Sequence, residues 1–105
     1  MGAGLVHKKD RYKFPKTEKQ MEKHIKGVAN HHRIKILMLI KEEEGITVDG
    51  ITTVLRGNFK TISEHTRRLV YAGLIEKKYR GRNIAHSLTP YGEIFVTFLK
   101  TFQYS

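Results

Sequence analysis

One segment of the sequence, residues 58–72, carries long hydrogen-bonding side chains at a helical spacing. At 100° per residue they share one side, and they are Lys60, Glu64, Arg67, Arg68 and Tyr71. The other side is a largely apolar seam of Ile62 and Leu69, flanked by Phe59 and Thr66. Arg and Lys on a helix reach guanine acceptors in the major groove, so this face is suited to DNA. The alternative is an ordinary solvated helix face.

The start of the same segment carries small hydroxyl side chains. Thr61 and Ser63 lie within the first turns, where hydroxyl groups and free backbone N–H groups bind phosphate. Asn58 precedes them and is expected to cap the helix. We therefore expect this end of the helix to approach nucleic acid.

A second basic cluster follows in a predicted hairpin with strands over 74–79 and 83–88. Its cations are Lys77, Lys78, Arg80 and Arg82, and with Glu76 they give residues 76–82 a net charge of +3. Gly81 between two arginines suits a tip that enters a minor groove or straddles a phosphate backbone. A solvated turn is the alternative, but residues 58–90 together hold +5 of the molecule's +10, and this clustering favours a binding role.

The overall composition agrees with an anionic partner. The chain has 105 residues, 20 Lys and Arg against 10 Asp and Glu, and no cysteine, which excludes disulfides and thiolate chemistry. This length predicts one domain, over 17–105, preceded by a flexible basic arm over 1–16 with a net charge of +4. Nucleic acid and an anionic membrane surface both suit such a charge. We expect no membrane binding, because the last amphipathic helix carries only Lys100 in its body.

Catalytic and metal-binding patterns are missing from the sequence. It has no phosphate-binding glycine loop, no Gly-x-Ser-x-Gly and no HExxH. The six histidines lack ligand spacing: His31 and His32 are adjacent, and His65 and His86 have no neighbouring ligand. We expect solvated or half-buried histidines, no metal, no cofactor and no enzymatic activity.

Capping residues predict about five helices around the hairpin. Thr17 with Gln20 forms a capping-box pattern, and Asn30, Thr47, Asn58 and Thr89-Pro90 can each begin a further helix. The second helix is almost wholly apolar and is expected to be the most buried element. The predicted fold is mainly α with a small β-hairpin wing, a winged helix-turn-helix.

Apolar stripes on the first and last helices exceed what so small a core needs. They are expected to pack against a second copy of the chain, through Met21, Ile25, Val28, Ile94, Phe95, Phe98, Leu99 and Phe102. The alternative is that the last helix closes the protomer's own core.

Residues 28–92 resemble the ArsR-like winged-helix transcription regulators. The segment 29–37 is similar to the family's opening A-(D/N)-x-x-R-x-x-I-L, and 61–75 resembles its recognition helix, T-V-S-x-H-L-x-x-L-x-x-A-G-L-V. Gly81-Arg82 followed by Ser87-Leu88-Thr89 resembles the wing. Thr66 and Phe59 depart from the pattern, since leucine and a polar residue are usual there. Residues 88–92 also resemble the L-T-x-x-G of MarR-like proteins, which leaves the subfamily open.

The resemblance implies a homodimer formed by the first and last helices, with two recognition helices in successive major grooves. Carried over residue by residue, it implies DNA contacts by Asn58, Lys60, Thr61, Ser63, Glu64 and Arg67, and wing contacts by Arg80 and Arg82 within 79–83. With Arg68 and Lys78, these are the expected DNA-binding residues. The last helix lacks the Cys, or Asp and His, that the family's metal sensors need.

The sequence therefore predicts a homodimeric, sequence-specific, double-stranded DNA-binding regulator, cytoplasmic and nucleoid-associated. The alternative is a winged-helix module that docks on protein or RNA without sequence-specific DNA binding. Exposed aromatic side chains favour RNA, and only Tyr71 and Tyr79 are candidates.

Overall fold

The computed structural model describes residues 14–105. In chain order the elements are α1 (Glu18–Val28), α2 (His31–Glu42), α3 (Val48–Leu55), α4 (Phe59–Tyr71), β1 (Ile75–Arg80), β2 (Asn83–Leu88) and α5 (Pro90–Gln103). The predicted architecture of five helices and one hairpin is confirmed. Most of the predicted basic arm lies outside the described residues, and residues 14–16 precede α1 without regular structure.

The predicted caps begin all five helices. Thr17 and Gln20 form the complete capping box, with Thr17 Oγ1 accepting from the Gln20 N–H at 3.2 Å and Gln20 Oε1 accepting from the Thr17 N–H at 2.8 Å. Asn30, Thr47 and Asn58 each accept from backbone N–H groups of the first turn of their helix, as Thr89 does ahead of Pro90. These local bonds satisfy donors that a helix start otherwise leaves free, which is why short sequence signals located them.

The core surrounds α2, as its composition predicted. Four of its residues are buried: Ile36, Leu37, Leu39 and Ile40. Ile51 from α3, Leu69 from α4 and Val96 from α5 pack into the same cluster. Burial of these aliphatic side chains is the main driving force that holds the helices together.

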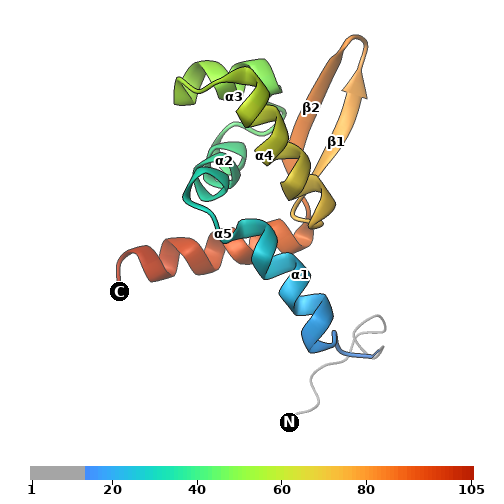
Figure 1. The fold of residues 1–105 in the computed structure, drawn as a ribbon, viewed down its shortest axis with the longest axis vertical. Coiled ribbons are helices and arrows are strands. Elements are labelled where there is room, and N and C mark those ends of the chain that lie inside the picture. Colours follow the sequence, from blue (N-terminus) through green and yellow to red (C-terminus); the bar gives the residue numbers. More distant parts are fainter. Residues whose placement is uncertain (1–13) are drawn as a thin grey trace.

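Strand β1 begins and ends one residue later than the predicted strand over 74–79, whereas β2 has the predicted bounds. Strands β1 and β2 pair antiparallel from Ile75 opposite Leu88 to Arg80 opposite Asn83, so Arg80 belongs to the strand. Gly81, at a φ of 62°, and Arg82 alone make the turn. The hairpin tip and α3 lie at one end of the molecule, and α1 and α5 lie towards the other (Figure 1).

Candidate nucleic-acid interface

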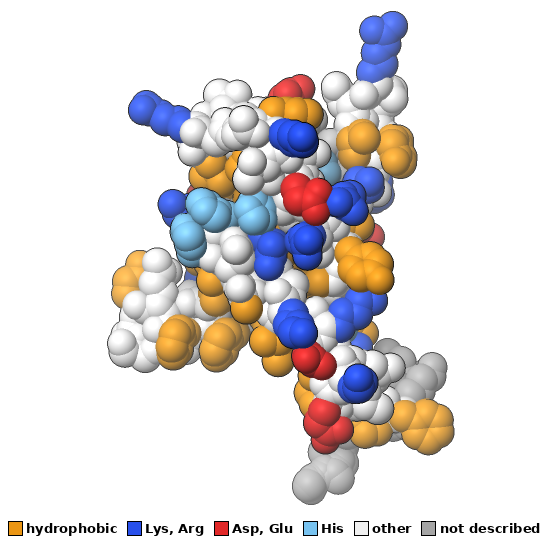
Figure 2. Space-filling view, in the orientation of Figure 1, with side chains coloured by type: hydrophobic (Ala, Val, Ile, Leu, Met, Phe, Trp, Pro, Cys, Tyr) orange, Lys and Arg blue, Asp and Glu red, His pale blue; other side chains and the backbone are white. Residues whose placement is uncertain are grey.

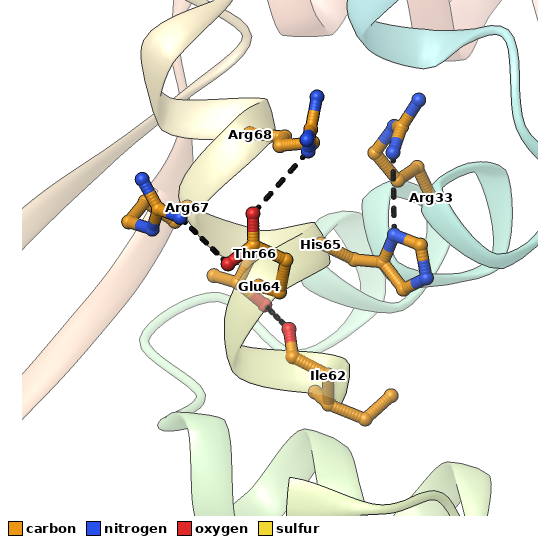
Figure 3. Close-up of polar contacts among 7 residues, drawn as sticks. All are labelled: Arg33, Ile62, Glu64, His65, Thr66, Arg67 and Arg68. Carbon is orange, nitrogen blue, oxygen red and sulfur yellow. Dashed lines mark hydrogen bonds and ion pairs between the residues drawn. The ribbon is translucent and has the colours of Figure 1, made fainter. Parts of the chain in front are cut away.

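The buried side of α4 fixes which side chains face outward. Ile62 and Leu69 are buried, and so is Thr66, whose hydroxyl donates to the Ile62 carbonyl at 2.8 Å (Figure 3). That bond explains how a threonine is accommodated at an apolar position, because its hydroxyl is satisfied within its own helix. Phe59 is largely exposed.

The start of α4 is both capped and open to solvent. Asn58 Oδ1 accepts from the Thr61 N–H at 3.0 Å, so Asn58 has a structural role whatever else it contacts. Asn58, Lys60 and Thr61 are exposed, and Ser63 is partly buried. The predicted contact residues of the first turn therefore lie on one accessible surface.

Further along α4, Glu64 forms ion pairs with two arginines. Its Oε1 lies 2.6 Å from Arg67 Nη2 and its Oε2 lies 3.4 Å from Arg68 Nε (Figure 3). The hydrogen bond from Arg67 is the main cause that lowers the pKa of Glu64, against partial desolvation. The carboxylate thus stays ionised and holds both guanidinium groups along the outer face of the helix.

An open groove of about 340 Å³ joins α4 to the hairpin and to the start of α3. Ser63 and Arg67 line it from α4, and Lys77 and Arg82 line it from the hairpin. Cations of α4 and of the hairpin therefore converge on one hollow. Figure 2 shows Lys and Arg side chains over α4 and at the tip of the hairpin on the same face.

The register of the hairpin separates its cations. Successive side chains of a strand point to opposite faces, so Lys77 shares the face of buried Ile75, whereas Lys78 and Arg80 lie on the other face. Lys77 was not among the predicted contacts, yet it is the strand lysine that lines the groove. The two-residue alternation counted from Ile75 is the sequence signal that identifies it.

The predicted dimer stripe divides into two rows. Met21, Ile25, Ile94, Phe98 and Phe102 are exposed, the last two at 56% and 65%, with their rings stacked 5.6 Å apart. Phe95 and Leu99 instead pack partly against the protomer's core. Val28 is only 6% exposed and belongs to that core, so it has little surface left for a partner. One row of α5 therefore closes the protomer's own core, and the other leaves an exposed apolar surface, visible over α5 in Figure 2.

Among the described histidines, His86 alone departs from the expectation of solvated or half-buried side chains. His86 is buried at 2% exposure, and its Nδ1–H donates to the Ile46 carbonyl at 2.9 Å, which compensates for the loss of water. The rings of His32 and His65 are stacked 5.4 Å apart, and His31 lies 4.0 Å from His32. Within residues 14–105, no three His, Asp or Glu side chains gather in a way that could hold a metal ion.

His65 also contacts Arg33, whose Nη1 donates to its Nδ1 at 3.3 Å (Figure 3). Desolvation is the main cause that lowers the pKa of His65, followed by the charges of Arg33 and His32. The neutral imidazole is therefore favoured at this junction between α2 and α4.

None of the helices in the described part of the chain has the length and apolar content that a bilayer crossing requires.

Comparisons with known proteins identify the fold. No protein-family model and no curated protein sequence matches the chain. Among solved structures, HlyU from Vibrio cholerae N16961 has a TM-score of 0.76 at 18% identity, over 88% of this chain and 100% of that one. PagR, a transcriptional repressor of Bacillus anthracis, has a TM-score of 0.71 at 21% identity, over 77% and 93%.

The description of a third similar structure names its architecture. It is the homodimeric winged helix-turn-helix DNA-binding domain, fragment 1–100, of Mb0332 from Mycobacterium bovis, a possible ArsR-family transcriptional regulator. Its TM-score is 0.74 at 23% identity, over 81% of this chain and 79% of that one. The fold of the present chain is a winged helix-turn-helix, with α3 and α4 as the helix-turn-helix and β1–β2 as the wing.

Proposed function

We propose that this protein is a homodimeric transcription regulator that binds double-stranded DNA in a sequence-specific manner and has no enzymatic activity. The observation that carries the proposal is the convergence of Arg67 from α4 with Lys77 and Arg82 from the hairpin on one open groove. A major groove admits an α-helix, and a basic hairpin beside such a helix can contact the flanking phosphates.

Each part of the surface has its own task in this proposal. Lys60, Thr61, Ser63, Arg67 and Arg68 of α4 face the major groove, and Lys77, Arg80 and Arg82 of the wing contact the backbone or the minor groove. Asn58 orients the start of the helix through its cap. Glu64 acts through the two arginines that it holds. Lys78 shares its face of the wing with Arg80 but lies further from the tip, and it contributes to the electrostatic attraction.

The exposed row on α5 supports the dimer. Ile94, Phe98 and Phe102, four residues apart, form a continuous apolar surface, and Met21 and Ile25 of α1 are exposed as well. Burying such a surface against a second copy places two recognition helices on one duplex. A DNA-binding regulator acts where the chromosome is, so we also propose a cytoplasmic, nucleoid-associated location.

Selection of genomic fragments with the purified protein, read beside its mass in solution, tests this function. We expect enrichment of a sequence with two related half-sites and a mass twice that of the 12.2 kDa chain. Equal binding to all duplexes would contradict sequence specificity. A monomeric species would contradict the two-half-site geometry, and tighter binding to single-stranded RNA would favour the interaction-module alternative, for which the exposed Tyr71 and Tyr79 are the available stacking surfaces.

A further inference from the structure

A second basic groove lies between α1, α2 and α4, apart from the groove beside the wing. It has a volume of about 210 Å³, and its lining residues are Lys23, Lys26, Gly27, Arg33, Arg68, Tyr71 and Ala72. Four of the seven are cations that come from three different helices, and none is acidic. Lys23, Lys26 and Arg33 were not among the expected DNA-binding residues, because they are spread over two helices that also carry acidic residues.

Close packing holds this groove in shape. A Cβ at Gly27 would lie 2.2 Å from the Ala72 Cβ, so α1 crosses the end of α4 at a distance that only glycine permits there. Arg33 Nε donates to the Gly27 carbonyl at 2.7 Å, and His24 Nδ1–H donates to the Ala72 carbonyl at 2.6 Å. These contacts join all three helices, so the cations are presented from a fixed framework.

The groove retains positive charge after its own ion pairs are taken into account. Lys26 Nζ lies 3.3 Å from Glu22 Oε2, and Arg68 Nε lies 3.4 Å from Glu64 Oε2. Both ion pairs are exposed to solvent, and they are therefore weak. Lys23 Nζ lies 4.9 Å above the ring of Tyr71, a side chain that is 78% exposed, and has no ion pair with a carboxylate among the described residues. A surface of this kind is suited to a phosphate-bearing ligand.

The groove is continuous with the DNA-facing side of α4. Arg68 and Tyr71 line it and also line a neighbouring hollow with Glu64 and Arg67. In Figure 2 the Lys and Arg side chains run on from α4 towards α1 on the same face of the molecule. A row of cations along an open surface follows a charged backbone better than it encloses a single small anion.

We propose that the DNA-binding surface extends over this groove, and that Lys23 and Lys26 of α1, with Arg33 of α2, contact phosphates next to the segment that α4 reads. The proposal rests on the proposed function and adds α1 to the DNA-contacting elements. Such contacts are independent of sequence and strengthen binding to every duplex.

The geometry of α1 makes the proposal separable from dimerisation. At 100° per residue, the mean direction of Lys23 and Lys26 lies about 150° around the helix from the mean direction of Met21 and Ile25, the exposed apolar residues. Replacing both lysines by glutamine therefore leaves the apolar surface intact. A matched control is K35Q/K41Q, which removes the same charge from exposed positions of α2 outside the groove lining.

The test measures binding of K23Q/K26Q, K35Q/K41Q and the unchanged protein to the selected duplex and to an unrelated one, by fluorescence anisotropy over a range of salt. We expect K23Q/K26Q to weaken binding to both duplexes about equally, by roughly 10-fold or more, and to lower the salt slope by about one per lost phosphate contact. The control should shift affinity by less than about 2-fold and keep the slope.

Two results would overturn the inference. One is K23Q/K26Q behaving as K35Q/K41Q does, while Arg67→Ala still removes sequence preference; the proposed function would then stand without an α1 contact. The other is binding of inorganic phosphate at the Gly27 and Tyr71 amides, seen by NMR and lost in K23Q/K26Q, with an unchanged DNA salt slope, which would assign the groove to a free anion. Absence of any duplex preference in the unchanged protein is a separate result, and it would count against the proposed function.

Discussion

Arg67 and Glu64 are joined by a charge-assisted hydrogen bond of 2.6 Å on the exposed face of α4. The bond holds the guanidinium group along the helix and offsets part of its charge. The bond therefore restrains Arg67, the strongest candidate for base recognition, and also reduces the attraction of Arg67 to phosphate.

Replacing Glu64 by glutamine should raise the affinity of the protein for all DNA duplexes. It should also reduce the difference in affinity between the selected duplex and an unrelated one. The substitution removes one negative charge from the proposed DNA-facing side and frees Arg67 and Arg68 to contact phosphates. We expect a several-fold gain on an unrelated duplex, a smaller gain on the selected one, and a steeper salt dependence. Anisotropy titrations with both duplexes measure this, and Glu42→Gln, at an exposed position of α2 that lines neither groove, is the control. A selective loss on the specific duplex, with no gain on the unrelated one, would instead assign Glu64 a direct base contact.

Gly27→Ala should destabilise the fold through its contact with Ala72. The new Cβ would meet the Ala72 Cβ at 2.2 Å, and overpacking of this kind costs about 1–3 kcal/mol, part of which the better helix propensity of alanine offsets. Urea denaturation of Gly27→Ala, Ala72→Gly and the double variant gives the coupling between the two sites. Recovery of stability in the double variant is expected. Simple additivity of the two changes would show that the helices do not depend on this contact.

Acidification should weaken the fold through His65. Its pKa is lowered from the usual 6.5 by desolvation and then by Arg33, so the unfolded chain binds protons more readily than the folded one. Stability should therefore fall as the pH drops below about 6.5 towards the lower folded value. His65→Gln should flatten that part of the stability profile, whereas His31→Gln should leave it unchanged. Thermal denaturation between pH 5 and pH 8, a range set by histidine titration, measures it; an identical slope in both variants would exclude His65 as the source.

Phe98→Glu should convert the proposed dimer to a monomer. Phe98 lies in the middle of the exposed row on α5 and stacks on Phe102, and a charge buried at such a centre costs about 2 kcal/mol or more. Sedimentation equilibrium should give the mass of one chain for Phe98→Glu. Val54→Glu, an equally exposed apolar position on α3, should keep the mass of two. A dimer that survives Phe98→Glu would place the interface elsewhere.

Local signals in the sequence were sufficient for the order of the elements. Asn30, Thr47 and Asn58 each bond within the first turn of their own helix, so the information lies within a few residues of each helix start. The division of the α5 stripe was not predictable in this way. Val96 and Phe98 both suit an apolar face, and only the placement of α5 on α2 decides that Val96 is buried and Phe98 exposed.

The groove between α1, α2 and α4 depends on contacts between distant residues. The net charge of sequence segments gave no sign of this groove, because the residues outside 1–16 and 58–90 have a net charge of only +1. The crossing of Gly27 and Ala72 brings Lys23 and Lys26 next to Arg68. Glu42, Glu43 and Glu44, which lower the sum, do not line the groove. The net charge of a sequence segment therefore did not predict which charges gather on the folded surface.

The measurement that tests the account most directly compares Arg67→Ala with Arg82→Ala on the selected duplex and on a scrambled one. If α4 reads bases and the wing holds the backbone, Arg67→Ala should reduce the preference for the selected duplex by about 1–3 kcal/mol, while Arg82→Ala weakens binding to both duplexes about equally. Unchanged preference in Arg67→Ala, together with unchanged affinity in Arg82→Ala, would contradict the recognition surface proposed for this protein.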